Sequence, residues 1–519
     1  MDFKGAKWQK CDFHLHTPAS KCFRDRQVTA EQWVDKCIEQ QLDCVAVTDH
    51  NTGAWVNAIK EAAKDKKLTI FPGVELTCDT SKVHILVLFD IDKTTQDVED
   101  FIIKCGIERK DFASSDAYSP KSCKEIIQLA HDSGGLAIPA HIDEFNGLGL
   151  LSKKVISELF SLDIVNGAQF VFAEFSKTKT SIDDALCKAY NAKYGRNEGE
   201  IGKEQIKQYY QCVQEAIKKN VALLTFSDNP DEGNPSKHGL KGIGSAYTWI
   251  KMSQNPSLES IRQALLFPER IKNCFDSKFN PFVEPSLWIK YIELKNTKLT
   301  KNEESFHIDF NPQLTTIIGG RGSGKSSVFR FLRGVLHLTK DIDQLGEIKN
   351  EQLRFFQKEK GGTGVLKDNT EIVVAFVRDG ILYKILYKQE NESLAISKFD
   401  NGHWITIDDP NFLDFFVLEQ CSQKQIFEMA KNANTLKNLI DNGSDDIGRL
   451  VAEIKECKNQ YLSAKAQLKI NLTAEEKIGK LNTEIADLNN KINSFKSSNI
   501  TEIANQQEKF INDYQMLDE

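Results

Sequence analysis

The sequence lacks an apolar run of about 18 residues, a Cys-x-x-Cys pair and an excess of positive charge. A membrane-spanning helix needs roughly 20 mainly apolar residues, so none is expected. Residues 1–13 have no long apolar core, so they are not expected to be a signal peptide. The 12 scattered cysteines predict reduced, mostly buried thiols in a cytoplasmic protein. The net charge of −7 excludes a uniformly basic nucleic-acid coat, so nucleic acid would have to be met by a local basic patch or by metal ions.

The 519 residues allow about three domains at roughly 100–200 residues each. We expect the boundaries 1–278, 285–442 and 443–519, with a proline-containing linker near 278–286. In the first domain, short apolar runs alternate with helical patterns such as 29–41. This order predicts an α/β domain with parallel strands, whose chemistry lies at the C-terminal ends of the strands. The expected strands are 44–50, 68–76, 82–90, 135–141 and 221–228.

Candidate metal ligands gather at these strand ends. His14 and His16 are two residues apart, so they face the same side of a strand and can bind one ion. The other candidates likewise lie at or beside strand ends, and they are His50, Glu75, His84, His141 and Asp228. A single such histidine is usually structural, but this set in one domain predicts a metal-dependent site.

The His-x-His, Thr-Asp-His and Gly-x-Glu motifs, the later histidine and the final aspartate resemble the PHP (polymerase and histidinol phosphatase) family over roughly residues 10–275. The resemblance implies a distorted (β/α)7 barrel that binds two or three Zn²⁺, Mn²⁺ or Fe²⁺ ions. It implies one ion held by His14, His16, Glu75 and Asp228, which are also the expected catalytic residues. A second ion would be held by Glu75, His84 and His141, with Glu75 bridging the two, and His50 would belong to a third.

The sequence departs from the family pattern at the third ion. Pro230 stands where the family has a histidine, and proline cannot bind a metal. His238 can substitute if its loop folds back, and Cys22 occupies the place of another usual ligand, although a lone cysteine is more often a packing residue. Two ions are therefore expected and the third position stays open. Asp49 is expected to orient a ligand histidine.

The expected chemistry is hydrolysis by a metal-bound hydroxide, because a bound cation lowers the pKa of water to ~7. No protein nucleophile is needed, and the sequence contains no Gly-x-Ser-x-Gly elbow and no recognisable Cys–His pairing. Arg24, Arg26 and Lys237 are candidates for neutralising a substrate phosphate, although such a residue is more often a solvated surface charge.

A phosphate-binding loop is predicted in the second domain. Residues 319–326 fit Gly-x4-Gly-Lys-Ser between an expected strand at 314–318 and an expected helix at 326–337. Such loops bind ATP with Mg²⁺ through backbone N–H groups, a lysine and a serine. The residues of this loop expected to contact ATP and Mg²⁺ are Gly319, Gly322, Gly324, Lys325, Ser326 and Ser327.

These surroundings resemble the SMC/Rad50-like branch of ABC ATPases, which implies an α+β head lobe, a Q-loop glutamine (Gln420 or Gln423) and a coiled-coil arm. A hairpin is expected at 371–388, turning at Asp379-Gly380. From about residue 444 the apolar residues follow spacings of three and four in two runs that are out of phase, and Thr473-x-x-Glu476 between them predicts a break or a stutter near 471–474. No LSGGQ-like or Walker B motif follows, so we expect the rest of the head in a longer protein or a second chain, and weak ATP hydrolysis by this chain alone.

Both domains together resemble the bacterial PHP–SMC, TrlF-like ATPases. The first functional hypothesis is a metal-dependent phosphodiesterase or nuclease controlled by the ATP-binding module, with nucleic acid as substrate, a homodimer or a complementary ATPase chain as partner, and a role in anti-phage defence. The second is a phosphatase for nucleotides or other small molecules. The third is a metal-binding platform without catalysis, which Pro230 favours and the intact ligands for two ions disfavour.

Overall fold

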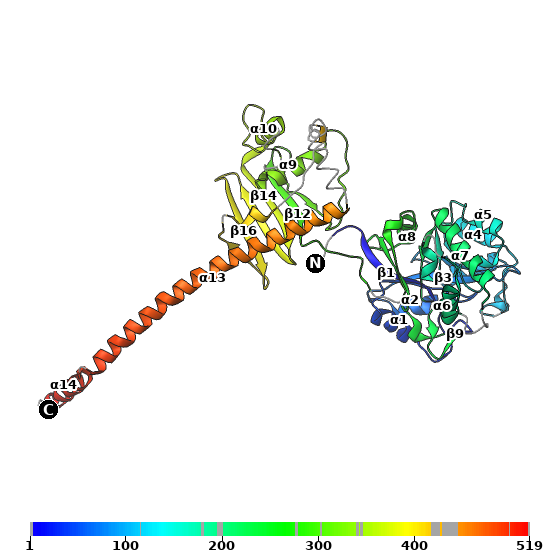
Figure 1. Cartoon of the computed structure of the whole chain (residues 1–519), viewed down its shortest axis with the longest axis horizontal. Coiled ribbons are helices and arrows are strands. Elements are labelled where there is room, and N and C mark those ends of the chain that lie inside the picture. The colour runs from blue at the N-terminus through cyan, green and yellow to red at the C-terminus, as the bar shows by residue number, and fades with distance from the viewer. Residues whose placement is uncertain are drawn as a thin grey trace. The chain divides into compact units, whose positions relative to one another are not determined.

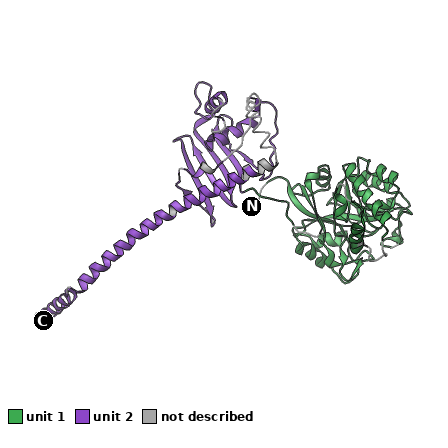
Figure 2. Ribbon diagram, viewed as in Figure 1, with its two compact units in different colours: residues 1–285 green, residues 286–519 purple. Residues whose placement is uncertain are grey.

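The computed structural model describes residues 4–114, 116–177, 181–194, 201–275, 279–301, 304–338, 342, 346–409, 411–416, 426–427, 445–497 and 499–516. They form two compact units, unit 1 (Met1–Pro285) and unit 2 (Ser286–Glu519), shown in Figure 2. Residues 279–285 at their junction have no regular secondary structure. Within the described ranges, no helix has both the length and the apolar character needed to cross a membrane.

Unit 1 is built on a curled seven-stranded sheet with the order β11-β10-β1-β2-β3-β4-β5. Its strands are β1 (Lys7–Leu15), β2 (Cys44–Val47), β3 (Thr69–Thr77), β4 (His84–Leu88), β5 (Leu136–Pro139), β10 (Tyr247–Met252) and β11 (Ile271–Cys274). The short parallel pair β6 (Gly167–Gln169) and β7 (Ala222–Leu224) lies between β5 and β11. This arrangement is the α/β half-barrel expected of a PHP-type barrel.

The expectation of parallel strands throughout is wrong. The pairs β1–β2 and β2–β3 are parallel, whereas β4 runs antiparallel to β3 and to β5, and β10 runs antiparallel to β1 and β11. The reason lies in the connections, because residues 78–83 between β3 and β4 are too few for a crossover helix and make a tight reversal. The reversal brings the start of β4 beside the end of β3, where both carry candidate ligands.

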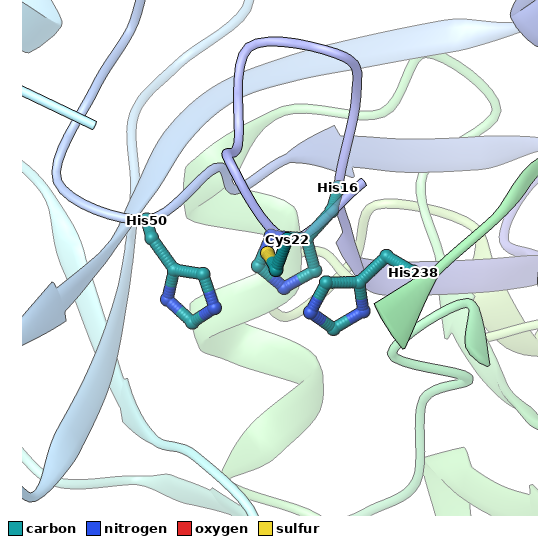
Figure 3. Close-up of side chains that lie close together, drawn as sticks. All are labelled: His16, Cys22, His50 and His238. Carbon is teal, nitrogen blue, oxygen red and sulfur yellow. The ribbon is translucent and has the colours of Figure 1, made fainter. Parts of the chain in front are cut away.

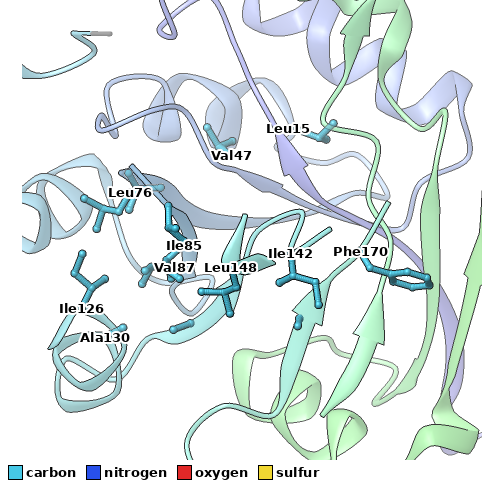
Figure 4. Packing of buried hydrophobic residues seen from close by; sticks show 14 of the residues in the cluster. Leu15, Val47, Leu76, Ile85, Val87, Ile126, Ala130, Ile142, Leu148 and Phe170 are labelled. Carbon is cyan, nitrogen blue, oxygen red and sulfur yellow. The ribbon is translucent and has the colours of Figure 1, made fainter. Parts of the chain in front are cut away.

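Helices cover the sheet (Figure 1). They are α1 (Ala30–Glu39), α2 (Val56–Ala62), α3 (Thr95–Lys104), α4 (Cys123–Asp132), α5 (Lys153–Leu159), α6 (Asp184–Tyr194), α7 (Lys203–Lys218) and α8 (Leu258–Leu265). Capping boxes fix the starts of α1, α3, α4 and α8, since the side chain at each N-cap and the side chain three residues later satisfy each other's backbone N–H groups. Both faces of the sheet are buried, and Figure 4 shows part of the larger apolar cluster.

Unit 2 contains a six-stranded antiparallel sheet with the order β13-β12-β14-β15-β16-β17. The strands are β12 (Leu287–Thr297), β13 (Phe306–Asp309), β14 (Leu366–Arg378), β15 (Ile381–Lys388), β16 (Ser393–Asp400) and β17 (His403–Ile407). Helix α9 (Lys325–Val335) packs on the sheet through Val328, Phe331 and Leu332, and α10 (Gly346–Phe355) follows it. The hairpin at Asp379-Gly380 is confirmed, since β14 pairs with β15 and both turn residues have positive φ, 50° and 77°.

Two local expectations for unit 2 are wrong. Residues 314–318 are not a strand, because they have no ladder partner among the described residues and Ile318 is 89% exposed. Helix α13 (Asp445–Ser497) passes through 471–474 without a break, and Thr473 Oγ donates to Lys469 O, one turn earlier, instead of capping a new helix. A stutter in the apolar repeat at this place stays a prediction. The chain bends later, at Asn499, before α14 (Ile500–Gln515). Gln420 and Gln423 lie outside the described residues, and winding of α13 around a partner stays a prediction.

Candidate metal centre

The predicted ligands of unit 1 converge at one end of the sheet. His14 lies on β1 and His16 follows it, Glu75 lies near the end of β3, His84 begins β4, and His141 and Asp228 come shortly after β5 and β7. The antiparallel register places His84 opposite Thr77, two residues after Glu75. Strands from distant parts of the sequence thus deliver imidazoles and carboxylates to one place.

Four of these side chains face a common point. His14 Nε2 lies 3.2 Å from His16 Nε2, 3.3 Å from Glu75 Oε2 and 3.3 Å from Asp228 Oδ1. His16 Nε2 lies 3.3 Å from the same Glu75 oxygen and 3.1 Å from the same Asp228 oxygen. Atoms bound to one Zn²⁺ at about 2.0–2.1 Å, with angles near 90–110°, are about 2.9–3.4 Å apart. The spacing therefore suits adjacent ligands of a single ion.

Glu75 also contacts three further imidazoles. Its Oε1 lies 2.7 Å from His84 Nδ1 and 3.2 Å from His141 Nε2, and its Oε2 lies 2.8 Å from His50 Nδ1. His50, Glu75 and His84 form a compact group, with ligand atoms within 4.8 Å of one another, as do His14, His16 and Glu75. The structure therefore places Glu75 between two sets of imidazoles, and it brings His50 closer to the second set than the sequence suggested.

The electrostatics of the metal-free chain favour a cation here. Burial disfavours a charged imidazole, but the Glu75 carboxylate outweighs it and raises the pKa of His50 to about 10 and that of His141 to about 9. Burial works against ionised Glu75 as well, yet the surrounding histidines hold the pKa of this carboxyl well below its usual range. Burial lowers the pKa of His84 to about 4 despite Glu75, so a neutral imidazole remains available as a ligand.

Several buried polar atoms of this cluster make no hydrogen bond. Among the described residues they include Glu75 Oε2, His84 Nδ1, His141 Nδ1 and Asp228 Oδ1. The close Glu75–His84 and Glu75–His50 pairs, at 2.7 and 2.8 Å, are therefore contacts without a hydrogen bond. Orphaned buried acceptors are costly, and a divalent cation would satisfy them. The residues present therefore fit a metal centre.

The backbone at two ligands is strained. His141 has φ 26° and Asp228 has φ 53°, a region that residues other than glycine rarely adopt. Such conformations persist where surrounding structure enforces them, and here each turns a side chain from a strand end into the cluster.

Supporting residues hold the ligand rings, and the sequence analysis missed most of them. Gln169 Oε1, at the end of β6, lies 2.8 Å from His14 Nδ1 and accepts from the backbone N–H of His141. This bond fixes the His14 tautomer and directs its Nε2 at the cluster. A buried Gln at a three-residue strand carries no sequence signal that separates it from ordinary packing.

Asp49 acts through Ser20 rather than directly. The Asp49 carboxylate accepts from the backbone and hydroxyl of both Thr17 and Ser20, and Ser20 Oγ lies 3.1 Å from His16 Nδ1. The predicted orienting role of Asp49 therefore reaches His16 through one intervening hydroxyl.

A further group lies beside the first. The ligand atoms of His16, Cys22, His50 and His238 are within 4.8 Å of one another (Figure 3). Burial would raise the pKa of the Cys22 thiol, but hydrogen bonds with His238 and His50 lower it to about 5. The sequence offered Cys22 and His238 as separate candidates for the third position, and the fold brings them together although they are more than 200 positions apart.

The predicted phosphate-binding cations contact other groups or are exposed. Arg24 pairs with Asp231 at 2.6 Å and Arg26 donates to Pro18 O, while Lys237 lies on the exposed strand β9 (Asn234–His238). A cavity of about 370 Å³ instead adjoins the centre at Asp228 and His238 and extends to Lys193 and Phe275.

The residues of the predicted phosphate-binding loop lie just before α9 and in its first turn. Gly322 and Gly324 have positive φ, 81° and 86°, which glycine adopts without strain. Lys325 Nζ donates to Gly319 O and Gly320 O at 2.6 and 2.7 Å. The glycines thus shape an exposed loop at a helix N-terminus with the lysine folded over it, and Ser326 and Ser327 lie in the first turn.

Comparisons with known proteins bear on unit 1. Residues 12–225 match the model of the PHP domain family. The 5′-3′ exoribonuclease Rnm of Salmonella typhimurium is 33% identical over 95 residues, which are 18% of this chain and 31% of that protein. The match therefore spans less than a third of this curated relative.

Two solved structures are also similar. A two-domain protein from Bacteroides vulgatus, described as containing a predicted PHP-like metal-dependent phosphoesterase, is 16% identical with a TM-score of 0.35, covering 60% of this chain and 88% of that chain. A protein from Bifidobacterium adolescentis, described as a metal-dependent phosphoesterase, is 15% identical with a TM-score of 0.28, covering 43% and 88%. Residues 12–225, which match the PHP domain model, include Glu75 and the five imidazoles that surround it, and this cluster is the candidate metal centre of the matched region.

Proposed function

We propose that unit 1 is a metal-dependent phosphodiesterase that cleaves nucleic acid. The observation that carries this proposal is the convergence of five imidazoles on Glu75, with Asp228 adjoining, at distances that suit ions shared through one carboxylate. Such a centre hydrolyses phosphate esters without a protein nucleophile.

The chain's own residues would hold and orient the centre. His14, His16, Glu75 and Asp228 would bind one divalent ion, and Glu75 with His84 and His141 a second. When bound, such ions lower the pKa of water to ~7 and offset the negative charge that develops on phosphorus. Gln169 and Ser20 keep His14 and His16 in place, so little reorganisation is needed during reaction.

The adjoining cavity supports a nucleotide-containing substrate. Its volume of about 370 Å³ falls in the range of small-ligand sites, about 300–1,000 Å³. Lys193 and Phe275 line the cavity beside the ligand Asp228, and the Lys193 amine lies 5.9 Å from the centre of the Phe275 ring. A bound nucleotide would place its phosphate near the amine and its base near the ring. The exoribonuclease named among the relatives supports the same substrate class.

Substrate preference is tested with the full chain and Mn²⁺, using end-labelled RNA and DNA oligonucleotides alongside a panel of mononucleotides. We expect shortened oligonucleotides, and no shortening by His14→Ala. Phosphate release from mononucleotides with intact oligonucleotides would replace the nuclease by the small-molecule phosphatase. If His14→Ala and Asp228→Ala left every activity unchanged, the centre would be a non-catalytic platform.

We propose in addition that unit 2 binds ATP and regulates unit 1. The exposed loop at the start of α9, with its two left-handed glycines and Lys325, supports phosphate binding. Nuclease assays with ATP, with a non-hydrolysable analogue and without nucleotide test the regulation. Equal rates in all three would contradict it. A dimeric or two-chain ATPase head and a role in anti-phage defence stay predictions of the family resemblance.

A further inference from the structure

Cys22, His50 and His238 form a second ligand set beside the Glu75 cluster, separate from the residues assigned to the first two ions. Their ligand atoms lie within 4.8 Å of one another, and Figure 3 shows Cys22 between the rings of His50 and His238. His16 is close as well, but its Nε2 faces Glu75 and Asp228 and its Nδ1 contacts Ser20.

A short hairpin brings His238 to this position. In the pairing of β8 (Pro230–Asp231) with β9, His238 lies directly opposite Pro230. The loop therefore folds back and places an imidazole beside the residue that cannot bind a metal. Gly242 permits this approach, since a Cβ there would lie 2.3 Å from Pro230 O.

Backbone pairing then fixes His238 next to Cys22. The N–H of His238 donates to Cys22 O at 3.1 Å, and the N–H of Arg24 donates to His238 O at 2.9 Å. Two hydrogen bonds in the same short stretch hold the thiol and the imidazole in register, so their proximity is a product of the fold.

The contacts of the His238 and His50 rings determine which nitrogen of each ring can bind a metal. His238 Nδ1 lies 2.8 Å from the backbone oxygen of Asp228, and a carbonyl only accepts, so this nitrogen carries the proton. His50 Nδ1 lies 2.8 Å from Glu75 Oε2 without a hydrogen bond, so this nitrogen faces the Glu75 cluster. His238 therefore keeps its lone pair on Nε2, and Nε2 is the nitrogen of His50 that is left for the set with Cys22; a ring held through its other nitrogen is typical of metal-binding histidines.

We propose that Cys22, His50 and His238 form a thiolate-containing Zn²⁺ site with one open coordination position. A thiolate with two imidazoles is a set that Zn²⁺ accepts in tetrahedral geometry, whereas Mn²⁺ and Mg²⁺ prefer oxygen ligands. The mixed carboxylate and imidazole set around Glu75 has no such preference. The chain would therefore hold different metals at adjacent positions. This inference concerns metal binding alone, so it stands or falls independently of the nuclease activity.

Cobalt provides the test, because a Co²⁺–thiolate bond gives a sulfur-to-metal charge-transfer band that imidazole and carboxylate ligands do not give. The full chain is stripped with a chelator, reloaded with Co²⁺, and examined by absorption and by metal analysis. We expect the band and about three ions per chain. Zn²⁺ should displace Co²⁺ from the thiolate site at a lower concentration than Mn²⁺ does. Absence of the band from the wild-type chain would overturn the proposal.

Matched variants assign the band to Cys22. Cys22→Ser and His238→Ala should lose the band and about one ion while retaining about two. Cys22→His should lose the band but keep about three ions. Cys457→Ser, which removes an exposed thiol of α13, should match the wild-type chain. A band that survives Cys22→Ser, or that disappears with Cys457→Ser, would contradict the assignment, and the two retained ions show that a variant is folded.

Discussion

Replacing Glu75 with glutamine keeps the shape of the side chain and removes the one negative charge that five imidazoles share. The carboxylate is 1% exposed and lies 2.7–3.3 Å from its partners His14, His16, His50, His84 and His141. An amide would present an N–H group toward a lone pair on at least one side. The variant should therefore weaken the binding of both ions at once.

The size of the effect follows from the bridging position. Loss of a supporting residue around a metal ligand typically costs about 10- to 100-fold in affinity, and loss of a ligand costs at least as much. Two affected ions give about 10²- to 10⁴-fold together, or about 3–6 kcal/mol. Removing any other ligand of the cluster, such as His84, should chiefly lower the affinity for one of the two ions.

Equilibrium dialysis of the full chain against Zn²⁺ and Mn²⁺ measures the affinities, and thermal unfolding with and without metal provides a second reading. Saturating metal should raise the unfolding temperature of the wild-type chain and leave Glu75→Gln nearly unchanged. Glu61→Gln, an exposed position on α2, serves as the control. If Glu75→Gln retained both ions within about threefold of the wild-type affinities, the bridging role would be refuted.

Three further predictions follow from the same contacts. Gln169→Leu should weaken metal binding by about 10- to 100-fold without unfolding the chain, because it removes the oxygen that orients a ligand ring; unchanged affinity in dialysis would contradict this. The metal-free chain should lose stability as pH rises from about 6.5 toward 9, since the pKa values of His50 and His141 are raised to about 10 and about 9 in the folded state. The stabilisation from these two histidines is complete below the pKa of an unfolded histidine and is lost as the pH rises through their folded-state pKa values. Cys22 acts in the opposite direction, because its pKa is lowered to about 5 in the folded state, but the two histidines together outweigh it. Thermal unfolding in chelator at the two pH values checks the sign. Lys325→Ala should weaken binding of a fluorescent ATP analogue by about 10- to 100-fold, the value of about 1.5–3 kcal/mol for a charged hydrogen bond, with metal content unchanged.

The sequence located the candidate ligands because their positions depend on local rules. His14 and His16 share a face by the two-residue period of a strand, and Glu75, His141 and Asp228 lie near strand ends wherever those strands pair. The turn at Asp379-Gly380 was equally local, since its two residues tolerate positive φ.

What the sequence did not reveal depends on contacts between distant segments. The sequence offered His238 and Cys22 as candidates at the third position, but their pairing requires the β8–β9 hairpin to fold onto the loop after β1, and neither segment carries a pattern that predicts this contact. Gln169 gained its role only through the placement of β6 beside β5. At Thr473 the expected cap failed because the hydroxyl bonds one turn back within a continuous helix.

The most direct test of the account asks whether metal at the Glu75 cluster contacts the phosphate that is cleaved. An oligonucleotide with sulfur in place of one non-bridging oxygen at a single phosphate is offered to the full chain with Mg²⁺ and, separately, with thiophilic Cd²⁺. The account predicts slow cleavage at that phosphate with Mg²⁺, recovery with Cd²⁺, and no recovery in Glu75→Gln. Cleavage that is equally fast at the sulfur-substituted and normal phosphates with either ion, or that persists in Glu75→Gln, would contradict it.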